Sequence, residues 1–124
     1  MAIALLSKRQ SDFHAKIAKI ISYVSEIGKY DIKISSLYRT QEEQKLAFDM
    51  KATKTLNSKH LDGLACDFIL FDRKTGKIIN DSSTYRVIGL IAELEGLVWG
   101  GRFGVKKADY GTKIGWDSGH VEAA

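Results

Sequence analysis

Three side chains that commonly bind metal ions, His60, Asp67 and His120, are the strongest sign of chemistry in this sequence. Asp67 stands inside the run ACDFILF (residues 65–71), which is otherwise apolar and has the composition of a β-strand. A carboxylate among apolar neighbours is costly unless its charge is compensated. The sequence therefore predicts a partner for Asp67, which can be either an arginine or a metal ion.

Two histidines and one aspartate form a suitable ligand set for Zn²⁺, and three protein ligands leave a fourth position for water, as in catalytic zinc sites. His60 precedes Asp67 in the chain, and Gly63 between them allows the chain to turn. His120 lies near the other end of the sequence, where it enters a predicted strand. Ligand types alone do not separate zinc from other divalent metals.

Two further residues of ligand type are assigned other roles. His14 falls within a predicted helix and has no partner nearby in the sequence, so we interpret it as a surface or structural residue. Cys66 adjoins Asp67 in the predicted strand, so its side chain should point to the opposite face and act as a small core residue. A single cysteine cannot form an internal disulfide, which fits a reducing compartment.

Acidic residues stand on both sides of His120. Asp117, three positions before it, could accept a proton from a water molecule whose pKa a metal has lowered. The alternative is that Asp117 simply forms the turn in DSG. Glu122, two positions after His120 and on the same strand face, could hold a ligand imidazole in place, or could be a solvated charge near the chain end.

Arg39, in SSLYRTQEE, falls between a predicted strand and a predicted helix. An arginine at such a junction can bind a substrate carboxylate or stabilise an oxyanion, although it can equally be an ordinary surface residue.

The elements that must position these residues follow from hydrophobic periodicity, caps and glycines. Apolar residues from Phe13 to Ile27 recur at helical spacing, and Gly28 is placed to end that helix. Thr40 and Glu43 have capping-box spacing at the start of a second helix. Other predicted elements are a strand at 31–35, a strand at 65–71, a turn in DRKTGK, a helix capped by Ser82 or Ser83 and ending at Gly96, and a strand in LVWGGRF. Because helices and strands do not alternate regularly, we expect an α+β fold with a small antiparallel sheet.

Composition limits the class of protein. A chain of 124 residues is expected to form one domain, and 44% hydrophobic with 27% charged residues is typical of a globular protein. No apolar run approaches the roughly 20 residues of a spanning helix, and MAIALLSKRQ is not a convincing signal peptide. We therefore expect accumulation in the cytosol. A net charge of +4 favours anionic partners such as nucleic acid, anionic membrane or cell-wall polymer, or serves only solubility.

Two segments together resemble a known family. SKHLDGLACDF fits the pattern Ser-x-His-x(6)-Asp, and DSGHVE fits the pattern acid-x-x-His, of zinc peptidases that cut the stem peptides of peptidoglycan. This family includes D-alanyl-D-alanine carboxypeptidases and dipeptidases and the L-alanyl-D-glutamate endopeptidases of bacteriophages. The resemblance extends from about Ile34 to the C-terminus and is supported by YRT and WGGRF. The fold that it implies is the α+β fold shared with the Hedgehog signalling domain.

The resemblance implies a role for each matching residue. His60, Asp67 and His120 would bind Zn²⁺, and Asp117 would act as general base and then as proton donor to the leaving amine. Carboxypeptidases of this family often carry glutamate at the position of Asp117, so aspartate is more similar to the phage endopeptidases. Three further residues receive roles: Arg39 at the oxyanion or substrate, Ser58 near the substrate, and Trp99 as a wall of the cleft.

The function that the resemblance implies is hydrolysis of the L-alanyl-D-glutamate bond in peptidoglycan by a phage endolysin. We expect a single zinc peptidase domain over residues 1–124, without a separate wall-binding domain, that acts as a monomer. It would accumulate in the host cytoplasm and reach the cell wall after release to the periplasm, without stable insertion into a membrane.

Three other functions remain as alternatives. A D-alanyl-D-alanine carboxypeptidase would use the same residues on a different bond. A zinc-stabilised wall-binding module without catalysis would have no need of Asp117. A nucleic-acid-binding protein is disfavoured, since the basic residues are neither clustered nor interleaved with aromatic residues.

Overall fold

The protein folds around a four-stranded antiparallel sheet with helices, as expected from the sequence. The structure is a computed structural model that describes residues 2–38, 40–50 and 59–124. The strands are β1 (Tyr30–Ser36), β2 (Ala65–Asp72), β3 (Val98–Trp99) and β4 (His120–Glu122), in the order β1-β2-β4-β3. The α-helices are α1 (Ala2–Ile27), α2 (Gln41–Asp49) and α3 (Arg86–Leu94), joined by the short 3₁₀ helices η1 (Lys59–Asp62), η2 (Ser82–Tyr85), η3 (Gly100–Arg102) and η4 (Lys107–Asp109).

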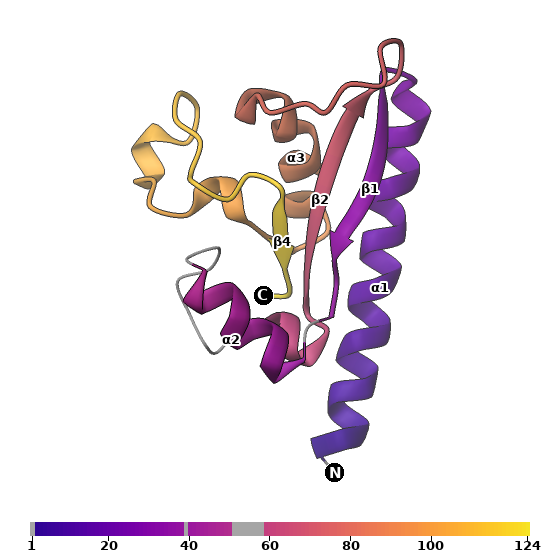
Figure 1. Ribbon diagram of the computed structural model, residues 1–124, viewed down its shortest axis with the longest axis vertical. Helices are drawn as coiled ribbons and strands as arrows, with labels where there is room; N and C mark the ends of the chain where they lie inside the picture. The colour runs from indigo at the N-terminus through magenta and orange to yellow at the C-terminus, as the bar shows by residue number, and fades with distance from the viewer. Residues whose placement is uncertain (1, 39, 51–58) are drawn as a thin grey trace.

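Helix α1 supplies one wall of the core. Its apolar residues recur every three or four positions and form a buried stripe of Phe13, Ile17, Ile20 and Val24. The helix begins earlier than the apolar pattern suggested and ends as predicted at Gly28, whose φ of 80° suits glycine. Figure 1 shows α1 running alongside β1, while α2 stands apart from it near the end of β4.

The central strand β2 has two chemically different faces. Cys66, Phe68 and Leu70 are buried and belong to the hydrophobic core that α1 and α3 complete. Asp67, Ile69 and Phe71 are only partly buried and point to the opposite face. Cys66 is therefore the core residue that the strand pattern predicted, and Asp67 lies on the face that is open to a cleft.

Two glycines leave room for Trp99 where the core packs against α3. Trp99 at the end of β3 is 1% exposed, and its indole Nε1 donates a hydrogen bond to the carbonyl oxygen of Ser118 at 2.7 Å. A Cβ atom on either Gly89 in α3 or Gly101 in η3 would overlap the indole ring. Both glycines therefore make room for the largest side chain of the core.

Two local expectations are corrected by the structure, and a third is confirmed. Asp81, and neither Ser82 nor Ser83, caps the helical segment, because its carboxylate accepts hydrogen bonds from the backbone N–H and the hydroxyl of Ser83. The strand predicted in LVWGGRF is only two residues long, since the glycine pair enters η3. The capping box of α2 is confirmed, and Leu46 in that helix and Met50 at its C-cap are 60% and 70% exposed.

None of the helices in the described ranges is both long and apolar enough to cross a membrane.

Substituting Gly89 tests this packing. We expect Gly89→Ala to lower the free energy of unfolding by about 1–3 kcal/mol, because overpacking against Trp99 outweighs the helix propensity of alanine. Urea unfolding measures the change. Gly111→Ala is the matched control, since a Cβ there would meet no atom within 4 Å. Equal stability of Gly89→Ala and the wild type would contradict the packing described here.

Candidate metal centre

The centre begins with a cross-strand pair. The antiparallel register of β2 and β4 places Asp67 opposite His120, next to the buried pair Cys66 and Val121. Directly opposed side chains lie on the same face of a sheet, so Asp67 and His120 meet on the face away from the core. His120 Nδ1 lies 2.8 Å from Asp67 Oδ1.

His60 reaches the same carboxylate from η1. Its Nε2 lies 3.2 Å from Asp67 Oδ2, and its Nδ1 lies 3.3 Å from the carbonyl oxygen of Leu37. Because a carbonyl only accepts, a proton on Nδ1 satisfies that contact, and Nε2 is the ring nitrogen that faces Asp67. The turn between the two residues depends on Gly63, whose φ of 67° suits glycine.

The arrangement fits a divalent metal ion. One ligand atom from each of His60, Asp67 and His120 can be chosen so that all three lie within 4.8 Å of one another. The two histidines are 2% and 7% exposed, so they are held by packing before any ion binds. Two imidazole nitrogens and a carboxylate oxygen are a donor set that zinc accepts. The sequence prediction that these three residues converge is met, while their occupation by zinc stays a prediction.

The electrostatics of the metal-free centre show how strongly its groups interact. Burial alone would raise the pKa of Asp67, but hydrogen bonds with His120 and His60 outweigh it and hold that pKa below its usual range. Burial likewise opposes protonation of His120, yet its hydrogen bonds with Asp67 and Glu122 raise its pKa to about 9. His120 is therefore charged at neutral pH without a metal. Burial, with Asp67 adding to it, raises the pKa of the Cys66 thiol to about 12, which keeps it protonated and inert.

Glu122 occupies the position that its proposed supporting role requires. Two residues after His120 on β4, its side chain lies on the same face, and its Oε1 is 2.9 Å from His120 Nε2. This contact turns the other ring nitrogen, Nδ1, toward Asp67. The hydrogen bond with His120 is the main cause that lowers the pKa of Glu122. A carboxylate that orients a ligand imidazole in this way is the usual companion of a metal-binding histidine.

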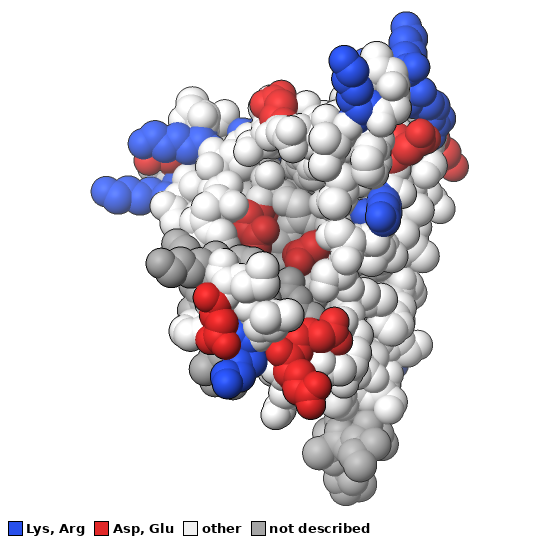
Figure 2. All heavy atoms as spheres, in the orientation of Figure 1, with Lys and Arg blue, Asp and Glu red and all other residues white. Residues whose placement is uncertain are grey.

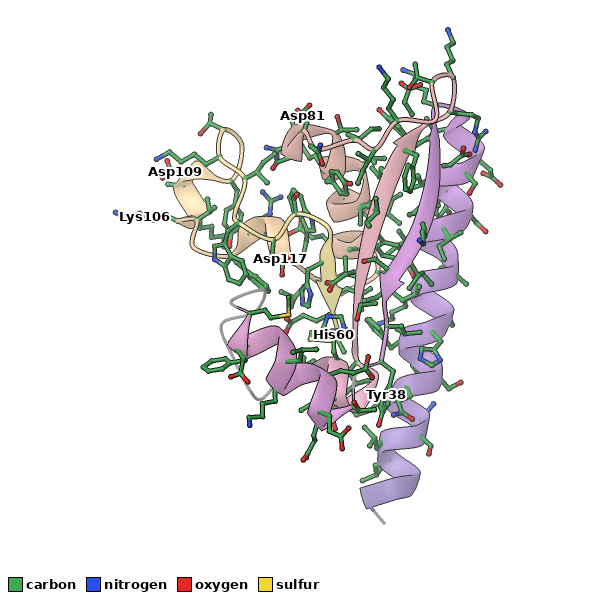
Figure 3. The ribbon with its side chains drawn as sticks, viewed as in Figure 1. Tyr38, His60, Asp81, Lys106, Asp109 and Asp117 are labelled. Carbon is green, nitrogen blue, oxygen red and sulfur yellow. The ribbon has the colours of Figure 1, made fainter. Side chains whose placement is uncertain are left out.

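Asp117 stands beside the three candidate ligands. Its Oδ2 lies 3.8 Å from His120 Nδ1, and its side chain is 39% exposed. Asp117 and Asp67 line a cleft of about 330 Å³ together with Phe68, Ile79, Asn80, Tyr85, Trp116, Ser118 and Gly119. Figure 3 shows Asp117 and His60 near β4, between the loop segment above them and α2 below. In Figure 2, acidic side chains lie at the hollow of this face, whereas lysines and arginines lie toward its edge.

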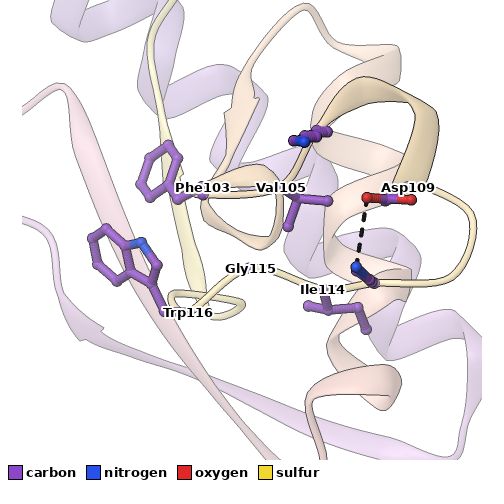
Figure 4. A pocket seen from close by; sticks show the side chains of 9 residues that line it. Phe103, Val105, Asp109, Ile114, Gly115 and Trp116 are labelled. Atoms are coloured by element: carbon purple, nitrogen blue, oxygen red, sulfur yellow. Dashed lines mark ion pairs between the residues drawn. The ribbon is translucent and has the colours of Figure 1, made fainter.

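A second pocket adjoins this cleft, and Trp116 lines both. The pocket has a volume of about 550 Å³ and is walled mainly by Phe103, Lys106, Asp109, Lys113 and Trp116 (Figure 4). The ring of Phe103 packs 5.3 Å from that of Trp116 and 5.6 Å from that of His120, measured between centroids. Sequence reasoning missed these residues. The one available signal was the position of Trp116 directly before Asp117.

The remaining predicted site residues have different outcomes. Trp99 does not form a wall of the cleft, because it is enclosed by the core and only 1% exposed. The exposed tryptophan beside the centre is instead Trp116, which is 61% exposed. Arg39 and Ser58 lie outside the described residues, so their predicted roles stay predictions.

Comparison with solved structures relates this fold to an enzyme. The crystal structure of the Serratia marcescens L-Ala D-Glu endopeptidase ChiX superimposes with a TM-score of 0.62, covering 95% of this chain and 85% of that chain at 18% sequence identity. The likeness shows that the chain has the fold of this endopeptidase, as the sequence resemblance implied. No family model and no curated protein sequence matches this chain.

Removing His60 tests the ligand set. We expect zinc to stabilise the wild type, by about 2.7 kcal/mol at a free concentration one hundred times the dissociation constant. His60→Ala should lose this response, because two ligands remain where three converge. Thermal unfolding with and without zinc measures it. His14→Ala is the control, since His14 is exposed on α1, and should respond as the wild type does. Equal stabilisation of His60→Ala would remove His60 from the ligand set.

Zinc binding should also release a proton. A nitrogen must be deprotonated to bind a metal, and the raised pKa of about 9 keeps His120 protonated at pH 7. We therefore expect close to one proton released per zinc at pH 7. The apparent affinity should rise about tenfold per pH unit until pH reaches about 9. Calorimetric titrations in buffers of different ionisation enthalpy measure this, and binding without proton release would show that His120 is neutral in the metal-free protein.

Proposed function

We propose that this protein is a zinc-dependent endopeptidase that hydrolyses the L-alanyl-D-glutamate bond of peptidoglycan stem peptides. The observation that carries the proposal is the convergence of His60, Asp67 and His120 with Asp117 beside them in an open cleft. The fold shared with an L-Ala D-Glu endopeptidase supports the choice of substrate.

The three convergent residues would hold the metal. When bound, zinc would polarise the scissile carbonyl group and lower the pKa of a water molecule in the cleft. His60 and His120 are fixed for this purpose by Leu37 and Glu122 respectively, so the ligands need little rearrangement.

Asp117 would transfer the proton. A general base must reach the attacking water and then the leaving amine, so it has to lie near the metal ligands without being enclosed by them. Asp117 meets this requirement, since it contacts the edge of His120 and keeps 39% of its side chain exposed in the cleft. Arg39 is the proposed partner of the oxyanion or of a substrate carboxylate.

The surroundings of the centre suit an extended substrate. The cleft holds the scissile bond in this proposal, and the larger pocket beyond Trp116 leaves room for the flanking part of the stem peptide. Exposed Trp116 offers a flat surface between the two. Such a layout favours cleavage within a longer chain, which is endopeptidase activity.

The biological setting that we propose is host lysis by a phage endolysin. The enzyme would be made in the host cytoplasm, reach the wall after release to the periplasm and act there as a monomer. Its net charge of +4 supports contact with anionic wall polymers.

Lysis of permeabilised cells, followed by analysis of the wall fragments, tests the function. We expect the protein to clear Gram-negative cells with permeabilised outer membranes, a chelator to stop clearing, and added zinc to restore it. Mass analysis of the digest should show new carboxyl ends on L-alanine and new amines on D-glutamate. Release of D-alanine alone would instead identify a carboxypeptidase, and zinc binding without any cleavage would identify a non-catalytic binding module.

Asp117 gives the sharpest mutational test of the mechanism. We expect Asp117→Asn to lower the rate of cleavage by about 10²–10⁴-fold, because the amide cannot accept the proton. Its zinc content should stay near that of the wild type, since Asp117 is not among the three convergent ligands. Asp12→Asn, which changes an exposed carboxylate on α1, is the matched control and should retain full activity. Loss of zinc from Asp117→Asn would make Asp117 a ligand and refute its role as base.

A further inference from the structure

We propose that Lys59 is a positioning residue of the metal centre, which acts by holding Glu122 against His120. The inference rests on the proposed metal site and adds a residue that sequence reasoning did not single out.

Lys59 connects the two segments that bring the histidines together. Its Nζ donates to Glu122 Oε2 at 2.9 Å and to the carbonyl oxygen of Ala123 at 2.6 Å. Lys59 is also the first residue of η1 and the direct neighbour of His60. One side chain therefore joins the segment that carries His60 to the end of the strand that carries His120.

Glu122 contacts both Lys59 and His120 through the two oxygens of its carboxylate. Its carboxylate is shared, with Oε2 bound by Lys59 and Oε1 lying 2.9 Å from His120 Nε2. Because both oxygens are engaged, the carboxylate cannot rotate without breaking one of the contacts. A fixed acceptor at Nε2 keeps the proton of the His120 ring on that nitrogen and directs Nδ1 toward the metal position.

The backbone around Lys59 strengthens this connection. The carbonyl oxygen of Lys59 accepts a hydrogen bond from the N–H of Leu64 at 2.9 Å. The carbonyl oxygen of Leu64 in turn accepts one from the N–H of Ala123, also at 2.9 Å. The backbone of Lys59 is thus linked through Leu64 to the end of β4. These hydrogen bonds fix the position from which the Lys59 side chain reaches Glu122.

A second lysine pair in the molecule provides a matched control. Lys19 Nζ lies 3.0 Å from Glu95 Oε1, and the exposed fractions of Lys19 and Glu95 are 59% and 21%. The corresponding fractions for Lys59 and Glu122 are 40% and 20%. Exposed ion pairs of this kind contribute little to stability. A loss of zinc affinity that is specific to Lys59 therefore points to the contact between Glu122 and His120. Glu95 contacts no candidate metal ligand in the described structure.

The experiment compares zinc affinities, measured by competition with a chromophoric chelator, in the full-length protein. We expect Lys59→Met to weaken zinc binding by about tenfold, the lower end of the loss seen when groups supporting metal ligands are removed. Lys19→Met should bind zinc as the wild type does. Lys59→Arg should recover most of the lost affinity, because a guanidinium can donate to the same two oxygen atoms.

Variants of Glu122 separate positioning from a general loss of structure. If Lys59 acts through Glu122, the double variant Lys59→Met/Glu122→Gln should bind zinc no more weakly than Glu122→Gln alone. Additive losses would overturn the inference, as would a Lys59→Met variant with wild-type affinity or a Lys59→Arg variant that recovers nothing. Failure of the wild type itself to bind zinc would be a different result, because it would refute the proposed metal site on which the inference rests.

Discussion

The contact between Asp67 and His120 is the interaction on which the site depends, and the register of two strands controls it. A slip of one residue between β2 and β4 would turn one of the two side chains toward the core. The neighbouring pair, Cys66 and Val121, opposes such a slip because both are completely buried on the core face. Hydrophobic packing on one face of the sheet therefore fixes polar geometry on the other.

This geometry concentrates negative charge at one place. Asp67, Asp117 and Glu122 surround the edges of His120, while Lys59 supplies a cation on the far side of Glu122. Without a metal, a proton on His120 offsets part of this negative charge, and the carboxylates therefore raise the pKa of that ring. A divalent cation at the same position would replace the proton and satisfy three side chains at once. The centre is thus organised for a cation before one is bound.

Sequence patterns predicted the parts of this structure that depend on local regularities. Helical periodicity from Phe13 to Ile27, the capping box at Thr40 and the strand around Asp67 all lie where they were expected. Contacts between distant segments were not accessible. Trp99 stands beside glycines, which are equally typical of a cleft and of tight packing, and only the approach of Gly89 shows that packing is the reason. The bridge from Lys59 to Glu122 likewise joins residues that no local pattern relates.

The structure also changes the reason for expecting a metal. Sequence reasoning treated Asp67 as a carboxylate buried among apolar residues, a burial that would itself require a cation. The alternating faces of β2 weaken that reason, since Asp67 keeps 24% of its side chain exposed and only its neighbours enter the core. The convergence of three ligand atoms from η1, β2 and β4 replaces it. Folds are shared by proteins of different function, so a likeness at 18% identity cannot carry this conclusion alone. These side chains, brought together by the fold, support the proposed metallopeptidase function.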